Sequence, residues 1–238
     1  MNVDAYGNTD IGLVRERNED ALWLDDEHGF YVVADGIGGL PDGNIASRMA
    51  VKLFRDRMDA LPSGSIPDIH RLFDEINQGV VNYGFRRYPD SGIGTTLTGV
   101  ILAPEHLWVG HIGDCVLFRC RGGELEQITT EHTIAEELKG HFHEHENIEL
   151  PEYFFHTLTQ CIGQQEHLNT EVLQLTIRSG DRYIICSDGI SKSIPQEDIG
   201  LICEQADNAR SCVARLLSEA LNYGGVDNAT AICLFVSL

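Results

Sequence analysis

The sequence has 238 residues, of which 37 are acidic and 17 are basic, and its formal net charge is −20. This excess of acid argues against nucleic acid or an anionic membrane as the main partner. The length suits one domain with a sizeable core, and no Pro/Ser-rich linker or membrane-length apolar run interrupts it. Because the first residues have neither the basic start nor the apolar core of a secretory signal, we expect a cytoplasmic monomer with residues 1–238 as a single domain.

The first elements predict a hairpin. A charged segment, residues 15–20, leads into an apolar strand at 21–24, which we expect to pair with residues 30–34 across a turn at 25–29. This pairing would bring Glu19 and Asp20 to the same end of the hairpin as Asp35. Taken alone, the charged segment is equally typical of a solvated loop.

Asp35 follows the second strand and opens a glycine turn, Gly36-Ile37-Gly38-Gly39, before a helical pattern that begins near Asn44. Glycines allow positive φ and close approach of another group to the backbone. The turn could cradle a phosphate, as in dinucleotide-binding folds, although Asp35 would then lie beside the phosphates. It could instead bind a cation through Asp35 and a glycine carbonyl, or be a capped connector without a ligand.

The middle of the chain alternates helix and strand patterns. Residues 66–83 have the apolar spacing of a second amphipathic helix. Strands are then predicted at 97–102, 107–112, 116–119 and 125–129, and Gly113-Asp114 follows the second of them. Residues of about 131–155 break this pattern, being polar, acidic and rich in histidine. The alternation of His141, His143 and His145 is more typical of an exposed loop than of a transition-metal site.

The last part of the chain predicts strands at 172–177 and 183–186, helices at 196–206 and 209–223, and a final strand at 229–236. Asp188-Gly189 follows the second strand, and Asp227-Asn228 precedes the last one. The seven cysteines contain no C-x-x-C pair, and several lie in apparent strands, so we interpret them as reduced core residues.

Four aspartates therefore lie at strand boundaries beside glycine or asparagine: Asp35, Asp114, Asp188 and Asp227. If they met at one end of a sheet, their charges would repel one another strongly unless cations lay between them. Ligand sets made only of oxygen suit magnesium or manganese. A pair of such ions lowers the pKa of a bridging water and clamps the oxygens of a displacement at phosphorus. The pattern thus favours hydrolysis of phosphate esters.

In collinear order, these motifs resemble those of type-2C serine/threonine phosphatases of the metal-dependent protein phosphatase family, in its compact bacterial form. The resemblance covers nearly the whole chain and rests on Arg15-x-x-Asn18-Glu19-Asp20, Asp35-Gly36-x-Gly38-Gly39, Gly94-Thr95-Thr96, Gly113-Asp114, Glu131-His132-Thr133, Ser187-Asp188-Gly189 and Asp227-Asn228.

The resemblance implies an α+β fold, an αββα sandwich of two antiparallel β-sheets flanked by helix pairs, with residues of about 131–157 as a flap. It also implies two Mn²⁺ or Mg²⁺ ions, bridged by Asp35, and a third, weaker ion held by Asp114 with Asp188. The implied metal ligands are Glu19, Asp35, Gly36, Asp114, Asp188 and Asp227.

By the same resemblance, Arg15 and Asp35 would be the catalytic residues, and Arg15 would bind the substrate phosphate bidentately. Asp20 and Asn228 would support the ligands from behind. A metal-bridging water would attack phosphoserine or phosphothreonine in proteins, in signalling opposed to a cognate serine/threonine kinase.

The sequence departs from the family pattern at two positions of interest. Ile37 stands where some relatives have a histidine that protonates the leaving group, and Lys192 stands where the family usually has an acid near the third ion. These departures leave a second hypothesis, a non-catalytic module that binds phosphoproteins on the same fold.

Overall fold

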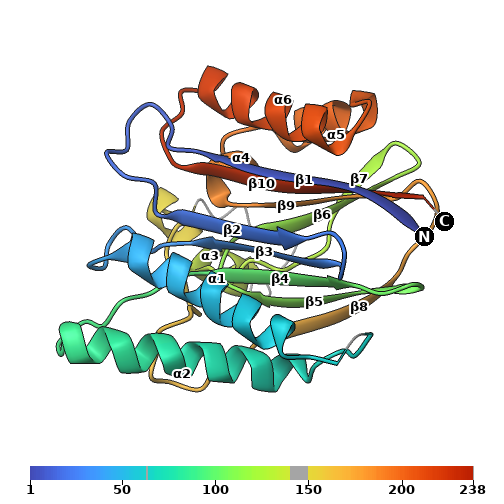
Figure 1. Ribbon diagram of the computed structural model, residues 1–238. Helices are drawn as coiled ribbons and strands as arrows, with labels where there is room; N and C mark the ends of the chain where they lie inside the picture. Colours follow the sequence, from blue (N-terminus) through green and yellow to red (C-terminus); the bar gives the residue numbers. More distant parts are fainter. Residues whose placement is uncertain (63, 140–149, 238) are drawn as a thin grey trace.

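The computed structural model describes residues 1–62, 64–139 and 150–237. Within these residues, ten strands form two five-stranded antiparallel sheets that pack face to face, with a helix pair on each outer side (Figure 1). The predicted αββα sandwich is therefore confirmed. His141, His143 and His145 lie outside the described residues.

The first sheet has the strand order β1-β10-β9-β6-β7, with the bounds β1 Asn2–Asp10, β10 Ala229–Ser237, β9 Arg182–Cys186, β6 Val116–Arg121 and β7 Glu124–Gln127. The second has the order β2-β3-β4-β5-β8, with the bounds β2 Asp20–Asp25, β3 Phe30–Asp35, β4 Leu97–Leu102, β5 His106–Ile112 and β8 Glu171–Thr176.

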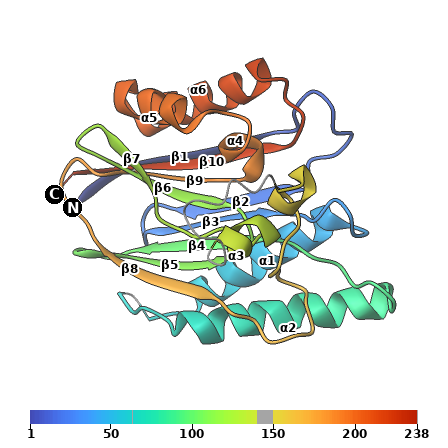
Figure 2. The same cartoon turned by 180° about the vertical axis from the view of Figure 1, so that it is seen from behind.

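Helices cover the outer face of each sheet. The second sheet is covered by α1 (Gly43–Asp59) and α2 (Ile69–Arg87), and the first by α5 (Gln196–Gln205) and α6 (Ala209–Asn222). Figure 2 shows the shorter elements from behind: α3 (Ile134–Lys139), the 3₁₀ turn η1 (Glu152–Phe155) and α4 (Asp188–Ser191). None of the helices among the described residues combines the length and apolar composition that a membrane crossing requires.

The core has three layers because both faces of the central strands are buried. In β3, Tyr31 and Val33 point between the two sheets, while Val32 and Ala34 face α1 and α2. A third cluster lies between the first sheet and α5 and α6. Because both faces of these strands are buried, their sequences are continuous apolar runs.

The predicted hairpin of β2 and β3 is confirmed, and its register pairs Asp20 with Asp35. The second helix was predicted from residue 66, but α2 begins at Ile69, where the side chain of Asp68 accepts a hydrogen bond from the Arg71 N–H (3.1 Å). This capping contact fixes the helix start three residues later than the apolar spacing indicated.

Strand β1 was not predicted. It lies at the edge of the first sheet, pairs with β10, and remains partly exposed along its length. Gly7 and Asn8 in its centre are residue types that strands disfavour. A half-exposed edge strand of this composition gives little periodic signal, so only its long pairing with β10 identifies it.

Candidate active site

The four strand-boundary aspartates meet in one cavity of about 810 Å³ at one end of the sandwich. The cavity brings together residues from the hairpin, the glycine turn, residues 156–158 and the segment before β10. It is lined by Arg15, Glu19, Asp35, Gly36, Ile37, Gly38, Gly39, Thr96, Asp114, His156, Thr157, Leu158, Cys161, Asp188, Val226, Asp227 and Asn228.

Asp35 is fixed at the end of β3 by two threonines of the neighbouring segment. Its N–H donates to Thr96 Oγ1 (2.8 Å), and Thr95 Oγ1 donates to its carbonyl oxygen (2.7 Å). Burial, together with the nearby carboxylates of Asp20 and Asp188, raises the pKa of Asp35 well above its ordinary value. The fold thus places a carboxyl group where ionisation is costly without a cation.

Asp20 lies behind Asp35 and is almost completely buried. Its Oδ2 accepts hydrogen bonds from Ser187 Oγ (2.8 Å) and Thr230 Oγ1 (2.6 Å). Burial raises the pKa of Asp20 to about 6, against the opposing effect of these two hydroxyl groups. Asp20 therefore ties the hairpin to both β9 and β10, as expected of a residue that supports the ligands from behind.

The glycine turn packs closely against Glu19. A Cβ atom on Gly43 would lie 3.2 Å from Glu19 Oε1, and one on Gly36 would lie 2.4 Å from the backbone of Gly43. The N–H of Gly36 also donates to the carbonyl oxygen of Glu19 (3.1 Å). Any side chain at these positions would displace Glu19 or the start of α1.

Asn228 holds the loop that carries Arg15 and Glu19. Its Oδ1 accepts from the Glu19 N–H (2.8 Å), and its Nδ2 donates to the carbonyl oxygens of Ile11 (2.9 Å) and Arg17 (3.0 Å). All the hydrogen-bonding capacity of this amide except one acceptor site is thereby used on the loop backbone. Asn228 is a positioning residue for the charged segment.

Arg15 lies at the mouth of the cavity and bonds Asp227. Its Nη2 lies 2.6 Å from Asp227 Oδ2, and 46% of its side chain is exposed. This hydrogen bond raises the pKa of the guanidinium further, although partial burial opposes it. A permanently charged fork at an open edge of an acidic cavity can reach an incoming phosphate.

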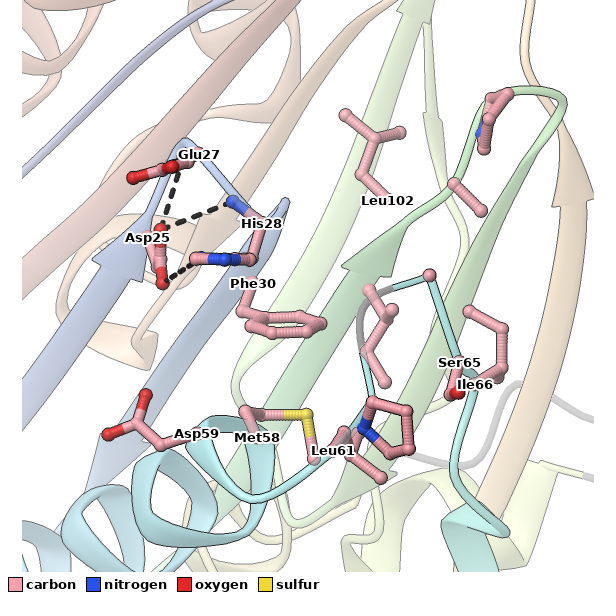
Figure 3. Close-up of a pocket in the computed structure, with 15 residues that line it drawn as sticks. Asp25, Glu27, His28, Phe30, Met58, Asp59, Leu61, Ser65, Ile66 and Leu102 are labelled. Carbon is pink, nitrogen blue, oxygen red and sulfur yellow. Dashed lines mark hydrogen bonds and ion pairs between the residues drawn. The ribbon is translucent and has the colours of Figure 1, made fainter.

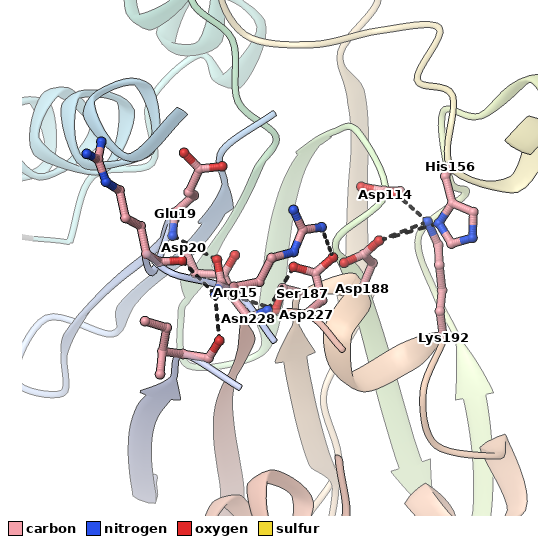
Figure 4. A network of polar contacts seen from close by, with 12 residues as sticks. Arg15, Glu19, Asp20, Asp114, His156, Ser187, Asp188, Lys192, Asp227 and Asn228 are labelled. Carbon is pink, nitrogen blue, oxygen red and sulfur yellow. Dashed lines mark hydrogen bonds and ion pairs between the residues drawn. The ribbon is translucent and has the colours of Figure 1, made fainter. Parts of the chain in front are cut away.

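Asp188 is brought beside Asp227 by a close approach of two backbones (Figure 4). A Cβ atom on Gly189 would lie 1.9 Å from the carbonyl oxygen of Asn228, so only glycine allows α4 to contact the start of β10 here. Burial raises the pKa of Asp188, but its contacts with His156 and Lys192 outweigh burial and leave that pKa below its ordinary value.

Asp114 follows β5 in a loop that His132 anchors. The N–H of Gly113 donates to His132 Nδ1 (3.1 Å), and the His132 N–H donates to the Gly113 carbonyl oxygen (2.7 Å). The carboxylate of Asp114 bonds the ammonium of Lys192 (2.5 Å). Burial lowers the pKa of Lys192, but Asp114 and Asp188 outweigh it and raise that pKa.

His111 lies beneath this loop and is completely buried. Its Nε2 lies 3.1 Å from the carbonyl oxygen of Thr130 and its Nδ1 lies 2.8 Å from Thr98 Oγ1. Because a carbonyl can only accept, Nε2 carries the proton in this arrangement. Burial, together with the neighbouring His132, lowers the pKa of His111 to about 3.

We therefore expect His111 to remain neutral as the pH falls from neutral to mildly acidic. The unfolded chain, with a histidine pKa of about 6.5, takes up the proton first, so this group alone lowers the unfolding free energy by about 2 kcal/mol between about pH 7.5 and pH 5. Histidine NMR titration checks this, with exposed His28 as control, because its hydrogen bond to Asp25 raises its pKa. A His111 signal that titrates near pH 6 would contradict the assignment.

The residues present fit a pair of hard divalent ions. Asp20 Oδ1 is buried without a hydrogen-bond partner among the described residues, and burial beside other carboxylates raises the pKa values of Asp35 and Asp114. No three acidic, histidine or cysteine side chains of the described chain form one tight cluster. Magnesium and manganese suit this open arrangement, since magnesium binds through one or two carboxylates and keeps several waters.

A second cavity, of about 550 Å³, lies at the opposite ends of β2 and β3 (Figure 3). Its walls include the apolar side chains of Phe30, Met58 and Leu61. Of its polar groups, Asp25 and His28 bond each other (2.9 Å).

All the metal-ligand candidates predicted from the sequence line this cavity. Some of the hydrogen bonds that support them were not predicted. Thr230 lies in the last strand outside any motif, and its bond to Asp20 exists only in the folded chain. Ser187 belongs to the Ser187-Asp188-Gly189 motif, but no role was predicted for its side chain. The contact between Lys192 and Asp114 joins residues 78 positions apart, so spacing could not have indicated it.

Known proteins resemble the chain over nearly its full length. The family model described as Protein phosphatase 2C matches residues 14–222. The serine/threonine phosphatase stp of Listeria monocytogenes is 26% identical over 240 residues, which cover 97% of this chain and 94% of that protein.

Solved structures give the same result. The catalytic domain of the serine/threonine phosphatase PstP, in complex with two manganese ions, has a TM-score of 0.83 at 29% identity and covers 99% of both chains. The Streptococcus agalactiae serine/threonine phosphatase has a TM-score of 0.88 at 26% identity, covering 99% of this chain and 100% of that one. With the carboxylate cavity, these matches establish that the chain belongs to the protein phosphatase 2C family of metal-dependent serine/threonine phosphatases.

Proposed function

We propose that Asp35, Glu19, Asp188, Asp227 and the carbonyl of Gly36 would hold two Mn²⁺ or Mg²⁺ ions in this phosphatase, with Asp35 as the ligand common to both. The observation that carries the proposal is the convergence of carboxylates from separate chain segments beside Arg15 in one cavity. When bound, such a pair of ions would lower the pKa of water and neutralise charge on the phosphoryl oxygens.

The chain's own residues supply the binding and orientation. We propose that Arg15 turns its guanidinium from Asp227 to the substrate phosphate, which its exposed position allows. Asn228 keeps the Arg15 loop in place, and Asp20 keeps the hairpin end against β9 and β10. Holding the reacting groups in a fixed geometry accounts for a large part of catalysis in phosphoryl transfer.

We propose phosphoserine and phosphothreonine proteins as substrates, in signalling opposed to a serine/threonine kinase. The flap that the resemblance assigns to residues 131–157 supports this, since His156 and Thr157 line the same cavity and could contact a bound protein. All seven cysteines are free thiols, which supports a reducing compartment and hence the cytoplasm. We propose a monomer acting as one domain.

Hydrolysis of a phosphothreonine peptide tests the function. We expect turnover in the presence of Mn²⁺, loss of turnover with EDTA, and recovery when excess Mn²⁺ is restored. Turnover that EDTA leaves unchanged would contradict metal dependence. Tight binding of the peptide without hydrolysis would favour the non-catalytic alternative.

Arg15→Lys tests the phosphate contact separately. Lysine keeps the charge but loses the two parallel N–H groups, so we expect kcat/KM to fall by roughly tenfold to a hundredfold, within the strength of a charge-assisted hydrogen bond. Arg17→Lys, in the same loop but outside the cavity lining, is the matched control. Equal kinetics for the two variants would remove Arg15 from phosphate binding.

A further inference from the structure

The ammonium of Lys192 lies beside the carboxylates of Asp114 and Asp188 (Figure 4). It directly follows α4 and places Nζ 2.5 Å from Asp114 Oδ2 and 3.3 Å from Asp188 Oδ2. Only 18% of the lysine side chain and 8% of the Asp114 side chain are exposed. The contact is therefore an ion pair shielded from water, where Coulomb attraction is much stronger than at the surface.

The cavity carboxylates fall into two groups according to the cation beside them. On one side lie Asp35, Glu19 and Asp227, of which Asp227 bonds Arg15 at the cavity edge, and about half of the Arg15 side chain is exposed to solvent. On the other side, the carboxylate of Asp114 is matched by Lys192, which also reaches one oxygen of Asp188. The first group of carboxylates is still short of positive charge, whereas Asp114 already bonds a cation.

A divalent ion that bound Asp114 would have to displace this ammonium or lie close to it. Displacement would leave a lysine charge in a poorly hydrated site without its partners, and coexistence would place like charges side by side. Both arrangements are unfavourable. The backbone at Lys192 is held in place, because it follows the short helix α4, whose Gly189 is packed against Asn228.

We propose that Lys192 is a built-in cation that takes the place of a third divalent ion, so that this chain binds two divalent ions and uses Asp114 as the counter-ion of a lysine. The inference rests on the proposed two-ion site and limits the number of bound divalent ions to two. It also assigns Asp114, which the resemblance made a metal ligand, to a different partner. Asp188 is left with one carboxylate oxygen for the ions and one near Lys192.

Counting the bound metal tests the proposal. Metal-free protein is dialysed to equilibrium against Mn²⁺, and bound metal is measured per chain by elemental analysis and by calorimetric titration. We expect two ions for the wild type and three for Lys192→Asp, in which a third carboxylate replaces the ammonium beside Asp114 and Asp188. The surface variant Lys52→Asp, which loses only a pairing with Asp56 on α1, should bind two ions.

A second variant covers the case in which Lys192→Asp does not fold. Lys192→Met keeps the length and apolar stem of the side chain but removes the charge, so we expect a third, weaker ion at higher Mn²⁺ concentration. Three ions bound to the wild type, or two ions bound to every folded Lys192 variant, would overturn the proposal. If either outcome occurs while turnover still depends on Mn²⁺, only the role of Lys192 is overturned and the proposed phosphatase function remains. If turnover of the wild type does not depend on Mn²⁺, the proposed function itself is overturned.

Discussion

Asp35→Asn should remove nearly all metal-dependent turnover while leaving the metal-free protein at least as stable as the wild type. The amide cannot bridge two cations, and loss of several kcal/mol of charge stabilisation at the phosphoryl group lowers kcat by on the order of 10³-fold. The same change removes a buried carboxyl group that lies among Asp20, Asp188 and Asp114.

The metal-free stability follows from the direction of the Asp35 pKa. Because the folded protein holds this proton more tightly than the unfolded chain, the stability contributed by the group is present at low pH and is lost as the pH rises through the raised pKa. The Asp35→Asn variant has no titrating group at this position, so its stability does not fall in this way as the pH rises. Thermal unfolding with and without Mn²⁺ measures both effects, since saturation at 100 times Kd stabilises the wild type by about 2.7 kcal/mol.

Asp26→Asn provides the matched control. Asp26 lies in the turn at the other end of the same hairpin and is absent from the residues that line the cavity. We expect this variant to keep wild-type turnover and the full Mn²⁺-induced rise in melting temperature. An Asp35→Asn protein that still gains stability and activity from Mn²⁺ would show that Asp35 is not a ligand.

Gly189→Ala should damage the fold and the metal site together. The added Cβ would lie 1.9 Å from the carbonyl oxygen of Asn228, and neither backbone segment can move without shifting the other. We expect a loss of about 3 kcal/mol of unfolding free energy, at the upper end of overpacking effects. Any adjustment separates Asp188 from Asp227, so Mn²⁺ affinity should fall as well.

Gly200→Ala, in α5, separates this effect from a general effect of removing glycine. The nearest atom to its added Cβ would be Leu125 Cβ at 3.4 Å, an ordinary contact. An alanine inside a helix favours folding by up to about 1 kcal/mol over glycine. Urea unfolding and Mn²⁺ titration compare the two variants. Wild-type stability and affinity in Gly189→Ala would contradict the close-packing account.

The sequence predicted those parts of the fold that are buried on both faces. β3 and β9 were found because their apolar runs end at Asp35 and, through Ser187, at Asp188, and the helix pairs were found from their apolar spacing. β1 was missed because its exposed edge carries no such pattern. The start of α2 depends on the capping contact of Asp68, and the apolar periodicity of the sequence gives no information about that contact.

The site was predictable to the extent that its residues lie in recurrent motifs. Asp35, Asp188 and Asp227 each follow or precede an apolar strand, which explains why their convergence could be expected. The partners of Asp20 come from β10 and from the end of β9, and the partner of Lys192 comes from the loop after β5. Such contacts depend on how the sheets pack, so a single sequence does not reveal them.

The most direct test of the account is electron paramagnetic resonance of the protein loaded with two equivalents of Mn²⁺. Ions that share Asp35 lie close enough for their spins to couple, so we expect the signal of an exchange-coupled manganese pair, which Asp35→Asn should eliminate. Signals of isolated Mn²⁺ ions in an enzyme that is fully active would contradict a shared carboxylate centre.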